Sequence, residues 1–149
     1  MAQEVKEKKT TVLKRPKISK PQWYEGTGRR KTAIARVRVF LGKEPMTING
    51  VAVDSYFPGA SAKREYERPL SLVNRLDSLT ATVKVLGGGS HSQLGALVHG
   101  LANALIKFDP TFRSQLSVAG LLTRDSRMKE SRKFGLAGKA RAKKQSPKR

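Results

Sequence analysis

The feature of this sequence that most constrains its fold is the separation of its charges from its apolar residues. Residues 80–123 are nearly neutral and contain only four charged side chains: Lys84, Lys107, Asp109 and Arg113. The ends are basic, since residues 1–20 hold seven Lys or Arg against two acids and residues 124–149 hold eleven against two. A segment this charged buries too little apolar surface to offset the entropy of ordering it. We therefore expect the packed core in the middle of the chain and binding functions at its ends.

These shifts in composition divide the 149 residues into three parts, which leave room for about one domain. We expect a flexible basic arm over residues 1–21, a globular body over residues 22–122 and an extended basic tail over residues 123–149. Gly135 and Pro147 argue against one long helix in the tail.

Two segments of the body alternate between apolar and polar residues, as half-buried strands do. The first is residues 32–41, in which Arg36 and Arg38 share one face, and the second is residues 79–86. The expected core face of the first strand comprises Ala33, Ala35, Val37, Val39 and Leu41. Between the two strands, residues 45–53 predict a short extended segment whose "NG" pair forms a tight turn.

Three segments have the spacing of helices. Residues 60–76 predict a helix in two pieces, divided at Pro69 because proline lacks a backbone donor. The long apolar stripe after the glycine run predicts a helix with Ser92 as its N-cap. A short helix is then expected with Asp109 as N-cap and Gly120 as terminator. Strands followed by helices predict an α+β sandwich with the helices on one face of the sheet.

The glycine run Gly87–Gly89, between a strand and a helix, resembles a phosphate-binding loop. A helix N-terminus after flexible glycines presents backbone N–H groups to an anion. The P-loop spacing is absent, however, because no lysine follows until Lys107, and Ser92 stands where the dinucleotide motif needs its third glycine. A phosphate bound here need not belong to a nucleotide, because an RNA backbone serves equally, and a nucleotide-hydrolysing site is not expected.

The usual residues of enzymes and metal sites are scarce. The chain has no cysteine, and its two histidines, His91 and His99, have no nearby acid to complete a metal site. No serine stands in the G-x-S-x-G pattern of hydrolases. We therefore expect no enzyme activity, no cofactor, no metal and no small-molecule substrate.

The formal charge of +20 points to a polyanionic partner, either nucleic acid or an anionic membrane. No apolar run approaches the roughly 20 residues of a spanning helix, and the N-terminus lacks the apolar core of a signal peptide, so we expect no membrane partner. No helix-turn-helix, zinc finger or basic zipper pattern indicates DNA binding. The aromatic content is only 6%, so base stacking is not expected to dominate. Recognition of the backbone and shape of a large folded RNA is the interpretation we favour.

Three basic features support this interpretation. Arg29–Lys31 come just before the first strand, where we expect a loop beside the sheet edge. Arg36 and Arg38 then share a strand face, and residues 131–149 contain no acid. Solubility alone does not require basic residues to be gathered apart from acidic ones. Neutralising the phosphates of a nucleic acid does require it.

Two alternatives remain at this point. The first is an enzyme of the same α+β fold class that depends on a nucleotide. Its nucleotide binding would survive deletion of residues 124–149, which calorimetric titration can test. A general nucleic-acid chaperone or nucleoid protein would bind duplex DNA as well as folded RNA, and sedimentation with one RNA–protein particle at high salt would count against it.

Four motifs, in this order, resemble the family of the ninth small-subunit ribosomal protein in its bacterial or organellar form. They are "YEGTGRRKTAIARV", "TVKVLGGGSHSQLGALVHGLANAL", "GLLTRDSRMKESRKFGL" and the terminal "KAR…Q…KR". The resemblance covers residues 24–149, and the four motifs together at family spacing are highly specific.

The resemblance implies a fold, a place and partners. The fold is the α+β sandwich shared with the second domain of the fifth small-subunit ribosomal protein, with a mixed sheet and helices on one face. The place is the head of the small ribosomal subunit on 16S-type rRNA, among neighbouring head proteins, in the cytoplasm or in an organelle. The tail of this family threads through rRNA, so that its last residues approach P-site tRNA.

The resemblance and the basic segments together give the expected RNA-binding residues. Those expected to bind rRNA are Arg29, Arg30, Lys31, Arg36, Arg38, Gly88, Gly89, Gln93, His99, Arg124, Arg127, Arg132, Lys133, Lys139, Arg141, Lys143 and Lys144. Those expected to bind tRNA are Lys148 and Arg149. The chain departs from the family pattern at four places, which are Ser92, Val98, Ser131 and Ser146–Pro147.

Overall fold

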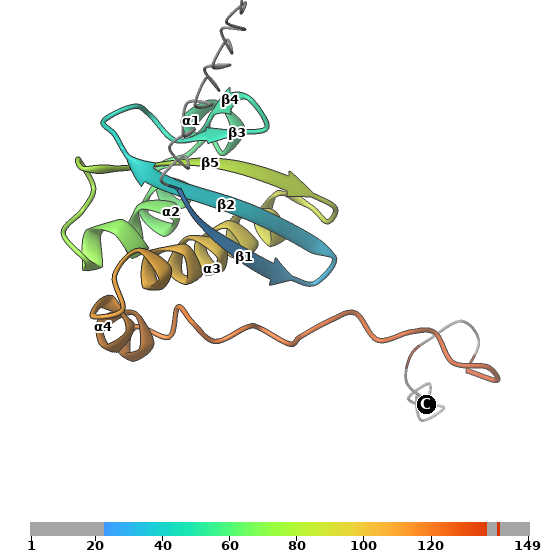
Figure 1. The fold of residues 1–149 in the computed structure, drawn as a ribbon. Coiled ribbons are helices and arrows are strands. Elements are labelled where there is room, and N and C mark those ends of the chain that lie inside the picture. Colours follow the sequence, from blue (N-terminus) through green and yellow to red (C-terminus); the bar gives the residue numbers. More distant parts are fainter. Residues whose placement is uncertain (1–22, 137–139, 141–149) are drawn as a thin grey trace, which may run out of the picture.

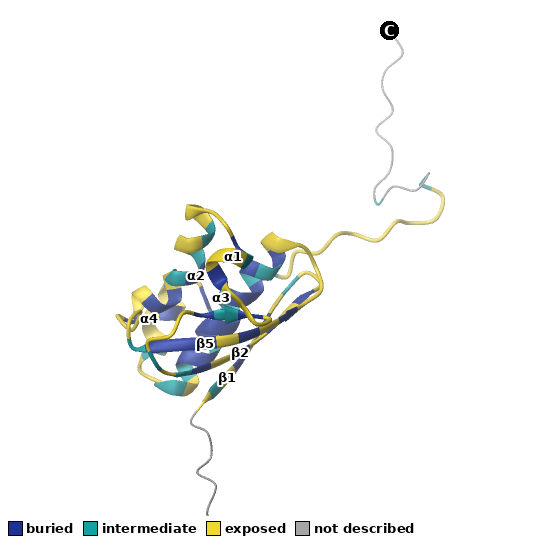
Figure 2. Ribbon diagram, turned by 90° about the horizontal axis from the view of Figure 1, so that it is seen from above, coloured by how far each residue is buried: buried dark blue, intermediate teal, exposed yellow. Residues whose placement is uncertain are grey.

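The computed structural model describes residues 23–136 and residue 140, in which a sheet and a layer of helices pack together. The sheet has five strands in the order β1-β2-β5-β3-β4, and the helices cover one of its faces (Figure 1 and Figure 2). The strands are β1 (Tyr24–Arg30), β2 (Ala33–Leu41), β3 (Thr47–Ile48), β4 (Val51–Ala52) and β5 (Leu79–Leu86). The helices are α1 (Val53–Tyr56), α2 (Ala60–Leu72), α3 (Ser90–Phe108) and α4 (Phe112–Val118).

The sheet is mixed, because β2 pairs antiparallel with both β1 and β5 while β3 pairs parallel with β5. Lys31 has a φ of 52° in the tight turn between β1 and β2. Asn49 and Gly50 have φ values of 51° and 86°, the positive values that a two-residue hairpin turn requires. The expected α+β class, the mixed sheet with helices on one face and the turn at the "NG" pair are all confirmed.

The alternation along the strands creates the core. The helix-facing side chains of β2 have no exposed surface, and they are Ala33, Ala35, Val37 and Val39. Three leucines of α3, which are Leu97, Leu101 and Leu105, are equally buried. Leu41 is 67% exposed at the end of β2, so its expected place in the core is wrong.

Strand β1 packs against α3 backbone to backbone. A Cβ atom on Gly28 would lie 1.9 Å from the carbonyl oxygen of Ala96, and one on Gly26 would lie 2.3 Å from that of Gly100. Gly100 is equally constrained, because its own Cβ would lie 2.8 Å from Cγ2 of Val37. No side chain larger than hydrogen fits at these places, so the glycines permit the close approach of strand and helix.

The boundaries of two helices differ from the sequence predictions. Helix α2 is continuous from Ala60 to Leu72 and contains Pro69, so the expected division there is wrong. Pro69 lies near the end of the helix and is buried together with Tyr66 and Leu70, so its packing offsets the missing donor.

None of the helices in the described ranges has the length and apolar character needed to cross a membrane.

Helix α3 is capped by Gly89 rather than by Ser92, so that prediction is wrong as well. The Ser92 N–H donates to the Gly89 carbonyl at 2.9 Å, which places Ser92 inside the first turn, and its side chain is buried. Asp109 accepts bonds from the backbone N–H and the hydroxyl of Thr111, although α4 begins later than expected, at Phe112.

The packing of β1 on α3 gives a direct test. Replacing Gly28 with alanine is expected to lower the free energy of unfolding by about 3 kcal/mol, because the new methyl group meets the backbone of α3. The measurement is chemical denaturation followed by circular dichroism. Gly89→Ala is the matched control, because nothing lies within 4 Å of its Cβ position, and a change within about 1 kcal/mol is expected. Equal effects of the two substitutions would contradict the tight packing.

Candidate nucleic-acid interface

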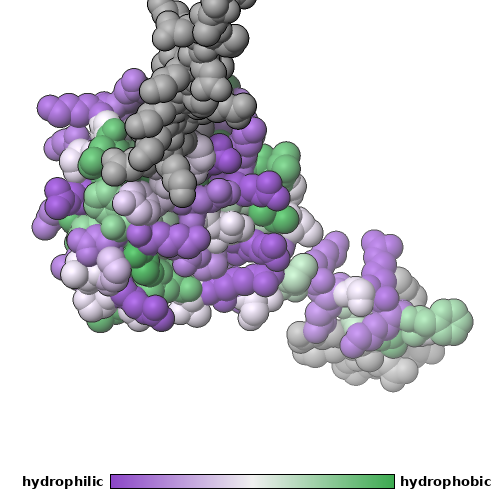
Figure 3. All heavy atoms as spheres, in the orientation of Figure 1, coloured by the Kyte–Doolittle hydropathy of each residue, from purple (hydrophilic) through white to green (hydrophobic). Residues whose placement is uncertain are grey.

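The face of the sheet away from the helices carries a cluster of basic side chains. We call it the open face, and its polar members are Glu25, Thr27, Arg29, Arg36, Arg38, Thr82 and Lys84, which alternate with buried residues along β1, β2 and β5. Four of these side chains are cations and one is an acid. Hydrophilic side chains predominate on the body in the view of Figure 3, which has the orientation of Figure 1.

The register of the strands places like charges side by side on the open face. Arg36 pairs directly with Lys84 on β5 and with the neutral Thr27 on β1. Like charges directly opposite each other destabilise a sheet in isolation. The register therefore leaves two positive charges of neighbouring strands directly opposite each other.

Arg38 is oriented by two neighbours on the same face. Its guanidinium lies 5.1 Å from the centre of the Trp23 ring, and its Nε lies 4.0 Å from the Glu25 carboxylate. A small hollow of about 120 Å³ lies between Glu25, Arg36, Arg38 and the β5 residues Thr82 and Lys84. Sequence reasoning missed Lys84, although the alternation of residues 79–86 already placed it opposite the core face.

Arg29 and Arg30 lie in strand β1, so their expected place in a loop is wrong, and only Lys31 of the three lies in the turn. The physical reason is that β1 extends to the tight turn and forms the edge of the sheet. Because side chains alternate along a strand, Arg29 and Arg30 lie on opposite faces. The Arg30 side chain crosses α3 at Gly95. A Cβ atom on Gly95 would lie only 2.4 Å from the Cδ atom of Arg30.

Arg30 faces an acid in the first residues of the tail. Its Nε lies 3.6 Å from Asp125, while Arg127 donates to the same carboxylate from Nε at 2.9 Å and from Nη2 at 2.7 Å. The hydrogen bonds from Arg127, followed by the charges of Arg127 and Arg30, hold the pKa of the Asp125 carboxyl well below its usual range. The ion pair between Asp125 and Arg30 thus holds the start of the tail against β1. The two residues are far apart in sequence, so no local pattern indicated that they pair.

His99 links α3 to β1 and to the end of the body. Its Nδ1 accepts a hydrogen bond of 3.3 Å from the backbone N–H of Arg29, so the neutral ring carries its proton on Nε2. Burial lowers the pKa of His99, a hydrogen bond with the Leu122 backbone opposes this, and the charge of Arg124 lowers it further. The His99 ring therefore joins α3 to β1 and to the Leu122 backbone at the end of the body, with Nδ1 as a hydrogen-bond acceptor.

The glycine run has a structural reason. Gly87 and Gly88 have φ values of 74° and 66°, and a Cβ on Gly87 would lie 2.7 Å from the Thr32 carbonyl oxygen. The Gln93 amide donates to the Gly87 carbonyl and accepts from the Tyr56 hydroxyl, at 3.1 and 3.0 Å. Gly88 and Gln93, both expected to bind rRNA, thus hold the loop against its neighbours.

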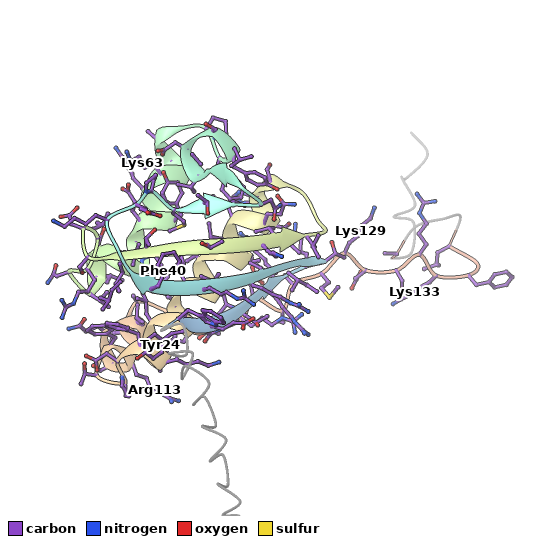
Figure 4. All side chains as sticks on the ribbon, turned by 45° about the horizontal axis from the view of Figure 1, so that its top comes forward. Tyr24, Phe40, Lys63, Arg113, Lys129 and Lys133 are labelled. Carbon is purple, nitrogen blue, oxygen red and sulfur yellow. The ribbon has the colours of Figure 1, made fainter. Side chains whose placement is uncertain are left out.

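The described part of the tail first lies beside β1, where Asp125 pairs with Arg30, and then extends beyond the body. Residues 123–136 contain neither helix nor strand, and Figure 4 shows Lys129 and Lys133 along this segment, outside the body. Four expected rRNA-binding side chains of this segment are exposed, and they are Arg124, Arg127, Arg132 and Lys133. The arm and the other expected RNA-binding residues lie outside the described residues, and the latter are Lys139, Arg141, Lys143, Lys144, Lys148 and Arg149.

The neutral His99 bridge predicts a pH dependence. Because the pKa of His99 is lowered in the folded chain, the unfolded chain binds more protons just below the ordinary histidine pKa of about 6.5. The free energy of unfolding should therefore fall as the pH drops from about 7.5 to about 5. His99→Gln should remove part of this fall in denaturation experiments at both pH values.

The other histidine provides the control for this experiment. His91 is exposed at the start of α3 and has no part in the bridge, so His91→Gln should leave the fall at its wild-type size. An unchanged fall in His99→Gln, or an equal reduction in both variants, would contradict the role of His99.

Comparison with known families was informative over most of the chain. The sequence profile of the family described as Ribosomal protein S9/S16 matches residues 28–149. This range includes both surfaces described above, apart from the first residues of β1. The match confirms the resemblance predicted from the four motifs.

Proposed function

This chain belongs to the ribosomal protein S9/S16 family, and on that premise we propose which of its surfaces bind RNA. Membership makes the chain a structural, RNA-binding component of the small ribosomal subunit that acts in translation, with rRNA and other ribosomal proteins as partners. The family is not enzymatic, which removes the alternative of a nucleotide-dependent enzyme.

The body binds rRNA of the subunit head through the open face. The observation that carries this proposal is the cross-strand pair of Arg36 and Lys84, whose repulsion an RNA phosphate between them would relieve. Arg38, held by Trp23 and Glu25, adds a third cation to the same strands. These side chains meet the backbone rather than the base edges, so the open face positions the protein without reading sequence.

The tail forms the second rRNA-binding surface. Its exposed cations follow one another on an extended backbone, which allows each to reach a different phosphate of a folded RNA. Arg30 and Asp125 fix the point where the tail leaves the body, so these cations start from a defined position. Arg127 pairs with Asp125 and still exposes 83% of its side chain, so it serves the anchor and remains accessible to phosphate.

The last residues of the tail bind P-site tRNA in this proposal. Support comes from the terminal "KAR…Q…KR" motif and from the two terminal cations, Lys148 and Arg149. Two cations at the end of a chain hold a tRNA backbone by charge, which does not depend on the tRNA sequence.

The open face can be tested through the salt dependence of binding. Full-length chain is titrated onto small-subunit particles that lack it, at several salt concentrations. Arg36→Ala with Lys84→Ala should weaken binding and reduce the slope of log affinity against log salt by about 0.7–0.9 for each phosphate that the variant no longer neutralises. Lys63→Ala is the matched control, because Lys63 lies on α2 at a distance from the open face and pairs with Glu67 (Figure 4). A double variant with the slope of the control would refute rRNA binding by the open face.

The tip of the tail needs a separate experiment. Removal of Lys148 and Arg149 should leave folding and incorporation into the subunit nearly intact, because both residues follow the body in sequence. The dissociation rate of P-site tRNA from the resulting subunits should rise, since two cations no longer neutralise tRNA phosphates. Ser146→Ala subunits serve as the control. Equal dissociation rates for the truncated and the control subunits would overturn the proposed tRNA binding while leaving the rRNA-binding surfaces untouched.

A further inference from the structure

One aromatic side chain stands apart from the others. The chain has one Trp, three Tyr and five Phe, and all but one lie in the body. Several aromatic residues of the body have close partners: Tyr24 meets Phe108 edge to face at 5.3 Å, and Trp23 lies beneath Arg38. Phe134 lies in the tail and is completely exposed, at 106% of the reference area. Within the described residues, nothing covers its ring.

The position of Phe134 suits a ring that projects outward. Phe134 and Gly135 form a turn in the otherwise extended tail, and Gly135 has a φ of 77°, a value that favours glycine. A turn places the side chain at its apex on the outside of the bend. An exposed phenylalanine contributes nothing to the packing of the body, and a fully exposed ring gains stability only when another flat or apolar surface covers it.

The neighbours of Phe134 indicate the chemistry of that surface. Arg132 and Lys133 precede it and are both exposed, and no acid occurs from residue 131 to the end of the chain. An aromatic ring beside cations is the pattern of proteins that bind unpaired nucleic acid, in which bases stack on the ring while cations meet the phosphates. An apolar protein pocket would account for the ring but not for the cations on both sides of it, among which no acid lies.

We propose that Phe134 stacks on an unpaired nucleobase of the small-subunit rRNA, with Arg132 and Lys133 on adjacent phosphates. This inference rests on the proposed binding of rRNA by the tail and adds base stacking to a tail otherwise described by charge alone. The base lies in a loop, a bulge or an end, because a paired base in an RNA helix offers no free face. The ring accepts any base, so Phe134 fixes the position of the tail rather than a sequence.

Stacking and phosphate neutralisation respond differently to salt, which separates the two roles. Removing a cation that neutralises a phosphate reduces the slope of log affinity against log salt, whereas removing a stacked ring lowers affinity at every salt concentration and leaves the slope unchanged. The experiment titrates full-length variants onto small-subunit particles that lack the chain. Phe134→Ala should weaken binding roughly 5- to 100-fold with an unchanged slope. Phe134→Tyr should bind like the wild type.

Phe134→Leu distinguishes a base from an apolar protein pocket. A leucine fills a pocket nearly as well as phenylalanine but offers no flat π face, so it should bind almost as weakly as the alanine variant. Full affinity of Phe134→Leu would overturn the stacking proposal in favour of a protein partner. Full affinity of Phe134→Ala would overturn it altogether. All variants should unfold at the wild-type midpoint, because the ring touches nothing in the body.

A crosslink provides a second measurement that does not depend on affinity. A photoreactive benzoylphenylalanine in place of Phe134 should crosslink to rRNA in assembled subunits, at a nucleotide mapped by primer extension. A crosslink to protein would overturn the proposal. If the wild-type chain failed to bind the particles at all, the proposed rRNA function would fail. Binding of the wild type with no effect of Phe134→Ala would remove only the stacking interaction.

Discussion

The close packing of the β1 backbone on α3 determines where the edge strand lies and where the tail begins. Gly26 and Gly28 allow the strand to lie directly on the helix, and no larger residue fits there. This packing holds β1 as the edge of the sheet and brings the Arg29 N–H to the His99 ring. It also brings the Arg30 side chain across α3, where it meets Asp125. The start of the tail is thus positioned by an interaction made inside the body.

Four basic residues in the described part of the chain have two different kinds of surroundings. Arg30 and Arg127 both pair with the Asp125 carboxylate. The Arg30 pair positions the start of the tail on β1. Arg36 and Lys84, in contrast, repel each other across two strands, and no described acid lies directly opposite either of them. A side chain that is paired internally helps folding, whereas one that is left beside a like charge is stabilised by an anionic partner. The net charge of +20 is therefore a poor guide by itself, and the partners of each cation decide what it does.

Much of the fold could be predicted from the sequence where periodicity was strong. The strands around Val37 and Val83 and the long helix after the glycine run all follow from their apolar spacing. Strand β1 could not be predicted, because Gly26 and Gly28 weaken its strand pattern. These glycines are needed for the close contact with α3, which lies about 70 residues away in sequence. The division of α2 at Pro69 was wrong because burial of the proline ring outweighs its local preference.

The candidate site was predictable in a similar, partial way. Alternation alone placed Arg36 and Arg38 on one exposed face, but the partner strand that adds Lys84 follows only from the register. The pairing of Arg30 with Asp125 joins two ends of the sequence and has no local signal. The glycine run suggested phosphate binding, whereas Gly87 and Gly88 are explained by their backbone angles and close neighbours.

A structure of the small ribosomal subunit containing this chain would show which face of the sheet meets the rRNA. Arg36, Arg38 and Lys84 should lie within about 4 Å of rRNA phosphate oxygens, with the packing of β1 on α3 and the Arg30–Asp125 pair unchanged. An open face directed to solvent, with the rRNA lying against α2 and α3 instead, would contradict rRNA binding by the open face.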